Sequence, residues 1–173
     1  VMWKANGYTP QRISTHNVEQ AMQTYGSIND RVWVYQEDGH LFYKLDLPNA
    51  QSTWVFDSTE RLWHERGFWD SEAVEYKPTL GRYQCFCFGK HLTLSDNGKV
   101  YEQSANFFDD DSMPIRRLRR APHLSNEATN IRYSHLTLQM QQWTVPEGVD
   151  PQMSLRYSND GGFNYSNERM ISA

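Results

Sequence analysis

The segment SNDGGFNY, residues 158–165, has residue types and spacing suited to a defined local chemistry. It approximates the Asp-box pattern S-x-D-x-G-x-T-W, because Ser158, Asp160 and Gly162 are in place, an asparagine replaces the usual Thr, and Tyr165 replaces the usual Trp. An aspartate in such a turn can accept backbone N–H hydrogen bonds, and a glycine can adopt a backbone conformation that is strained for other residues. The segment therefore predicts a structural hairpin turn with its aromatic packed beneath it, and no catalytic role.

The one basic cluster is RRLRR, residues 116–120. Its arginines are Arg116, Arg117, Arg119 and Arg120. Arginine can bind phosphate through two parallel hydrogen bonds, so these residues are candidates for phosphate contact. The favoured interpretation is that they pair with the acidic run Asp109–Asp111 or with an acidic neighbouring subunit. No aromatic residues alternate with the arginines to stack on bases, which weakens the phosphate interpretation.

Other residue types common in catalytic and metal sites are present without the spacing that makes a site. Cys85 and Cys87 lie two residues apart on one face of an expected strand, where they cannot form an unstrained disulfide, and we interpret them as reduced core residues. The six histidines are scattered, and no zinc, P-loop, dinucleotide-binding or G-x-S-x-G motif is present. We therefore expect no catalytic residues, no metal and no cofactor.

The elements that must position these residues are mostly β. The exception is residues 14–26, where Val18, Ala21, Met22 and Tyr25 recur at helical spacing and predict one short helix.

The segment 31–70 changes to a period of two and divides into four apolar runs separated by turn residues. Asp38-Gly39 is a strong signal for a type I′ hairpin turn, which needs positive φ angles. Four antiparallel strands joined by tight turns make a β-meander with the size of one propeller blade. Its tryptophans are therefore expected to pack within the protein rather than bind a ligand. They are Trp33, Trp54 and Trp63.

The same alternation recurs more weakly in residues 81–104 and 114–173, which we interpret as further blades. Asn97-Gly98 predicts a second type I′ turn. Strands are expected in PIRRLRRA, residues 114–121, and in IRYSHLTLQM, residues 131–140.

The predicted fold class is all-β: residues 1–173 form a single β-propeller-like domain, a stack of antiparallel meanders with one short N-terminal helix. The chain starts without Met inside a segment whose pattern is typical of folded protein, so we expect a fragment of a longer chain. A net charge of −4 and a pI near 5.8 argue against a general nucleic-acid binder. No apolar run approaches the length that crosses a membrane.

Several segments resemble one family: the packaged-DNA stabilisation proteins of P22-like short-tailed bacteriophages, also described as the tail hub or tail accessory factor. The most specific segments are GYTPQRISTH, the block DGHLFY…TWVFD…LWHERG, and SNDGG. Weaker likeness lies in FGKHL…NGKVYE, and the resemblance extends over nearly the whole chain.

The resemblance implies a structural virion protein without catalytic residues, assembled in the cytoplasm of the bacterial host. Members of the family form a ring, normally a hexamer, below the portal and its adaptor. The ring closes the head after packaging, prevents DNA from leaking out, and offers docking surfaces for the tail needle and tailspikes. Contact with DNA is then transient and non-specific, and no membrane is involved.

Two alternatives stay open. The Asp-box-like turn also suits a fragment of a carbohydrate-active, sialidase-like propeller. The cluster Arg116–Arg120 also suits a nucleic-acid-binding module.

Overall fold

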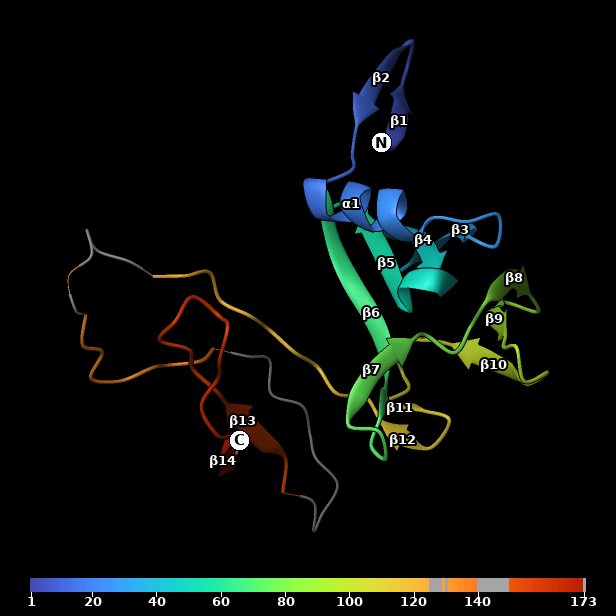
Figure 1. Cartoon of the computed structure of the whole chain (residues 1–173). Helices are drawn as coiled ribbons and strands as arrows, with labels where there is room; N and C mark the ends of the chain where they lie inside the picture. Colours follow the sequence, from blue (N-terminus) through green and yellow to red (C-terminus); the bar gives the residue numbers. More distant parts are fainter. Residues whose placement is uncertain (125–128, 130, 140–149, 173) are drawn as a thin grey trace. The chain divides into compact units, whose positions relative to one another are not determined.

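The computed structural model describes residues 1–124, 129, 131–139 and 150–172. The chain forms two compact units, Val1–Arg117 and Leu118–Ala173. The described residues are mostly β, with one α-helix and several antiparallel sheets (Figure 1). In the described part, no helix combines the length and the apolar character needed to cross a membrane.

A five-stranded antiparallel meander dominates the first unit, and its strands follow one another in space as they do in the sequence. The strands are β3 (Arg31–Glu37), β4 (His40–Leu47), β5 (Ser52–Asp57), β6 (Leu62–Asp70) and β7 (Glu75–Pro78). The first four coincide with the apolar runs of residues 31–70, so the antiparallel pairing expected there is confirmed. β7 adds a fifth strand.

The hairpin turns follow backbone chemistry. Asp38-Gly39 has φ angles of 49° and 81°, the two left-handed residues of a type I′ turn. At Asn97-Gly98 the expected type I′ turn is wrong, because only Gly98 is left-handed and its N–H donates to the carbonyl of Ser95 at 3.0 Å. The loop is therefore one residue longer, and glycine follows the turn. Phe88-Gly89, with φ angles of 54° and 72°, makes a two-residue turn, although Phe-Gly is not one of the dipeptides that usually predict such a turn.

Smaller sheets complete the first unit. A three-stranded antiparallel sheet has the order β10-β9-β8, and two hairpins have two strands each. Their strands are β8 (Tyr83–Cys87), β9 (Lys90–Leu94), β10 (Val100–Gln103), β1 (Trp3–Asn6), β2 (Thr9–Arg12), β11 (Asp109–Asp110) and β12 (Met113–Pro114).

The helix α1 (His16–Tyr25) is shorter than residues 14–26 at both ends. It ends where the N–H of Gly26 donates to the carbonyl of Met22 at 2.9 Å. The φ of Gly26 is −55°, so a left-handed backbone is not the reason for glycine here. A Cβ at this position would lie 2.3 Å from the Met22 oxygen, which only glycine avoids.

The apolar core lies between α1 and one face of the meander. Val18 of α1 packs with Leu45 and Leu47 of β4, and Trp54 and Trp63 pack against this cluster, as expected for packing residues. Trp63 also donates from Nε1 to the carbonyl of Ile13 at 2.7 Å. Trp33 pairs with Lys44 and therefore lies on the opposite face.

Among the described residues of the second unit, β13 (Gln152–Leu155) pairs with β14 (Arg169–Ser172) to form a hairpin. The strands expected in residues 115–121 and 131–139 are absent, and residue 140 lies outside the described residues. All described side chains in 131–139 are exposed. Alternation predicts a strand only where one face becomes buried and a neighbouring strand completes the hydrogen bonds, and neither condition is met here.

Candidate functional site

The face of the meander opposite α1 carries a buried network of charged side chains. In β4, Lys44 and Asp46 alternate with Leu45 and Leu47, so the charges face away from the apolar core. They are nevertheless 4% and 0% exposed. A buried charge is tolerated only when other groups compensate it, and Arg82 and Arg31 do so for Asp46.

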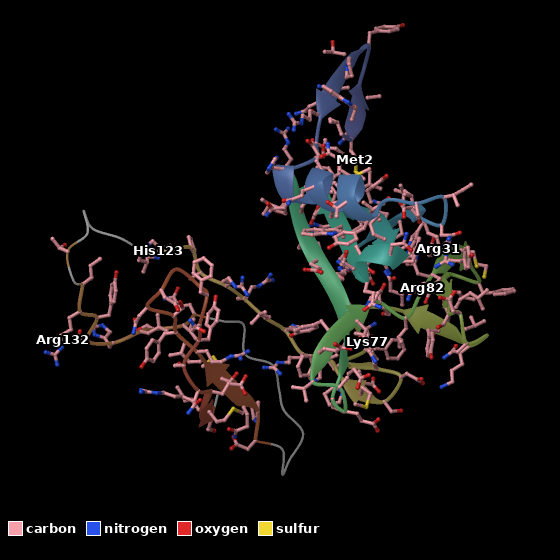
Figure 2. All side chains as sticks on the ribbon, viewed as in Figure 1. Met2, Arg31, Lys77, Arg82, His123 and Arg132 are labelled. Atoms are coloured by element: carbon pink, nitrogen blue, oxygen red, sulfur yellow. The ribbon has the colours of Figure 1, made fainter. Side chains whose placement is uncertain are left out.

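Asp46 is the centre of the network. Both of its carboxylate oxygens accept hydrogen bonds from Arg82 Nη1, at 2.9 and 3.0 Å, and Oδ1 also accepts from Thr53 Oγ1 at 3.0 Å. Arg31 Nη1 lies 3.6 Å from Oδ2. Arg82 and Arg31 also contact Asp96, at 3.0 and 3.7 Å. The labelled Arg31 and Arg82 lie close together in Figure 2. The network thus ties strands β3, β4 and β5 to the residues flanking β8 and β9.

Lys44 lies beside this centre, with its Nζ 4.5 Å from the centroid of the Trp33 ring. Burial lowers the pKa of Lys44 to about 7, and the positive charge of Arg66 acts in the same direction. Asp46 and Asp110 partly oppose this change. Near neutral pH, Lys44 therefore populates both its charged and its neutral form.

Two further groups at this face have altered proton affinity. Burial raises the pKa of Asp110, although the charge of Lys44 opposes the change. Burial also raises the pKa of Tyr35, whose hydroxyl accepts a hydrogen bond from Arg66 Nη1 at 2.5 Å. Arg66 Nε donates to His64 Nε2 at 3.0 Å.

A lysine with a pKa near 7 can act as a base or a nucleophile in an open cleft. Lys44 is enclosed, however, and Asp46 is fully engaged by the side chains around it. We therefore interpret the network as a joint between the meander and the following sheet. The two charged residues inside LFYKLDL are the only sign of this buried network in the sequence. The sequence does not predict the network, because charges on alternate strand positions usually face water.

The predicted Asp-box-like turn lies between β13 and β14. Asp160 Oδ1 accepts from Ser158 Oγ at 2.7 Å and from the backbone N–H of Asn164 at 2.9 Å, and Oδ2 accepts from Asn164 Nδ2 at 2.6 Å. Ser158 Oγ accepts from the N–H of Gly162 at 2.8 Å, and Gly162 has a φ of 95°. The hydrogen bond from the Asn164 backbone, with those from the side chains, lowers the pKa of Asp160 to about 2.

The aromatic of this turn and the basic cluster meet in the second unit. Tyr165 is 40% exposed, and its hydroxyl lies beside the turn, where a Cβ on Gly162 would come within 3.3 Å of it. The Arg120 guanidinium carbon lies 5.5 Å from the Tyr165 ring centroid. In the first unit, the Arg116 guanidinium carbon lies 4.3 Å from the centroid of Trp69. Two of the four arginines thus stack on aromatic rings. Asp111 of the acidic run contacts Lys99 at 2.7 Å.

The two cysteines and the possible metal ligands are the remaining candidates from the sequence. Cys85 and Cys87 are free, with their Sγ atoms 3.8 Å apart. Cys85 is exposed, so the interpretation of both as core residues is wrong, because this face of β8 does not lie in the core. Among the described residues, no three His, Cys, Asp or Glu side chains gather as metal ligands would.

No protein-family model, curated protein or solved structure matches the chain.

Proposed function

We propose that the chain is a structural protein of a short-tailed bacteriophage tail. It closes the portal channel after DNA packaging, stabilises the packaged DNA, and serves as the hub for needle and tailspike attachment. One observation carries the proposal. The block with the most specific resemblance, residues 38–67, builds a meander in which Trp63 contacts the rings of Tyr43 and Phe56. The charged side chains of Lys44, Asp46 and Asp57 are buried in it. A meander with such internal contacts suits a structural role better than the binding of a ligand.

The meander is then one blade of a propeller-like domain. Full-length subunits assemble into a ring, as a hexamer, between the portal adaptor and the tail needle. The chain is part of the virion, it is not an enzyme and it holds no cofactor. Charges enclosed between sheets, as at Asp46, support this role because a subunit that retains DNA needs joints that resist opening.

A genetic test separates this function from others. Phage lacking the protein should package DNA and then lose it, which nuclease protection of the DNA in purified heads measures over time. Resupplying the wild-type protein should restore retention, and so should the variant Lys90→Met, which alters an exposed ion pair. Stable, DNA-filled heads in the complete absence of the protein would refute the proposal.

A second candidate function is favoured by the hydrogen-bonded turn at Ser158 and Asp160, which suits a sialidase-like propeller. Such an enzyme needs an arginine cluster and a carboxylate with a tyrosine at the centre of a complete propeller. Hydrolysis of a fluorogenic sialoside would favour this enzyme and contradict the structural role.

The third candidate is nucleic-acid binding through Arg116–Arg120. Its signature would be DNA binding that weakens steeply with salt and is lost in Arg117→Ala/Arg119→Ala. Weak binding that these substitutions leave unchanged would exclude the cluster as a DNA site.

A further inference from the structure

The hairpin β1–β2, together with its turn, forms an arm, residues 3–12. Its base is held to the rest of the unit, because Arg12 pairs with Glu19 of α1 at 2.7 Å. All eight residues of its strands are exposed, and Tyr8 in the turn is fully exposed. The arm extends away from α1 (Figure 1). An isolated two-stranded hairpin is at best marginally stable in water. The tip of the arm at Tyr8 therefore makes no packing contact with its own unit that would stabilise it.

A groove of about 400 Å³ lies at the base of the arm, against the face of the meander that also holds the core. Its walls are mainly apolar: Met2, Trp3, Val34, Leu41, Tyr43 and Phe56. Lys4 and Ser58 also line it, and Lys4 Nζ donates to Ser58 Oγ at 2.5 Å. The volume greatly exceeds the roughly 30 Å³ that one water occupies.

Two of the groove residues remain open to solvent on the strand side. Val34 of β3 and Leu41 of β4 are exposed, although they point to the same face as the buried Leu45. Burying such side chains is worth about 25 cal/mol per Å². The groove therefore favours an occupant with an apolar body and one polar group.

We propose that the groove of one copy of this chain binds the arm tip of a second copy, with Tyr8 as the anchoring side chain. A tyrosine ring matches the apolar walls, and its hydroxyl matches the polar pair Lys4 and Ser58. Tyrosine is also enriched among the residues that dominate the energy of protein interfaces. The arm and the groove thus supply to each other the packing that each one lacks.

The reach of the arm fits this joint. Tyr8 lies five positions along the chain from Trp3 at the base, which at about 3.3 Å per residue is roughly 16 Å. Two arms lying antiparallel, side by side, would place each tip at the other's base. Because the arm sheet has only two strands, each strand has a free edge for such pairing.

Sedimentation of the purified chain over a range of concentrations tests the inference. The wild type should associate reversibly. Tyr8→Ser should weaken association at least about tenfold, as loss of an interface anchor does. Because Tyr8 is fully exposed, this variant should keep the wild-type circular dichroism spectrum and melting temperature. Tyr25→Ser, at another exposed tyrosine, is the matched control and should associate normally.

A mixing experiment identifies the partner surface. Val34→Glu blocks the groove and leaves the arm intact, whereas Val100→Glu changes an exposed valine outside the groove and serves as its control. Tyr8→Ser and Val34→Glu should each be defective alone and should associate when mixed, because the mixture holds one intact arm and one intact groove.

A wild-type chain that stays monomeric up to its solubility limit would overturn the inference. So would association that both variants leave unchanged, or variants that fail to complement each other. The inference rests on the arm and the groove and is independent of the proposed function. If the arm does not bind the groove, the outcome of the DNA-retention test is unaffected. If the retention test fails, the contact between arm and groove can still be present.

Discussion

Replacing Lys44 with Met removes a buried ammonium group and keeps a side chain of similar length. In the folded chain the pKa of Lys44 is about 7, against 10.5 for an unperturbed lysine. At 1.36 kcal/mol per pKa unit, this difference corresponds to a cost of about 5 kcal/mol for burying the charged form. Methionine avoids the cost and loses the contact with Trp33, which is worth about 0.5–2 kcal/mol.

The lowered pKa of Lys44 makes the stability of the wild type depend on pH. Below pH 7 Lys44 is charged in both folded and unfolded chains, so the folded state carries the whole cost. Between pH 7 and 10.5 the unfolded chain binds more protons, so the free energy of unfolding of the wild type rises with pH, by about 1.4 kcal/mol per unit. Lys44→Met lacks this rise. We therefore expect the variant to be about 3 kcal/mol more stable near pH 6, with the advantage disappearing towards alkaline pH.

Urea unfolding followed by tryptophan fluorescence, repeated between about pH 6 and pH 10, measures both quantities. The variant's melting temperature near pH 6 should be roughly 6–12 °C higher. Lys90→Met is the control, because Lys90 is exposed and pairs with Glu102, and it should change stability by less than about 1 kcal/mol. A Lys44→Met variant that is less stable at every pH, or whose advantage does not depend on pH, would refute the reasoning.

Three further outcomes follow from the geometry. Arg82→Ala leaves the buried carboxylate of Asp46 without its main partner and should lower the free energy of unfolding by about 3–5 kcal/mol in a urea titration. Gly26→Ala forces a Cβ against the Met22 carbonyl and should destabilise the chain by about 1–3 kcal/mol, measured by its melting temperature; an unchanged value would contradict the contact. The pKa of Asp160 is lowered to about 2, so the turn it stabilises should be fully formed above about pH 4 and be lost as the pH falls through about 2. Amide NMR shifts of the turn should follow this titration in the wild type and not in Asp160→Asn.

The strands of residues 31–70 could be predicted because two independent local signals agree. Alternation places Leu45 and Leu47 on one face, and Asp38-Gly39 fixes the register of the first hairpin. The close approach of Gly26 to Met22 could not be predicted. In the sequence it looks the same as a helix that ends at a glycine with a left-handed backbone conformation.

The charge network could not be predicted because it depends on pairing across long sequence separations. Lys44 and Asp46 look like solvent-facing positions until a second sheet covers them, and Arg82 is 36 residues from its partner Asp46. The prediction of a strand around Arg117 was wrong because an alternating pattern does not show whether a neighbouring strand is present to pair with it.

The same difference in sequence separation orders the folding of the first unit. Strands β3 to β7 each pair with their sequence neighbour through short loops, whereas the joint at Asp46 must close a much longer one. Local pairings lose less chain entropy on closure, so they form early. The meander should therefore be largely assembled in the transition state, and the Arg82 contacts should form after it. Substitutions at Arg82 should then accelerate unfolding with little effect on the folding rate, whereas changes at Asp38-Gly39 should slow folding.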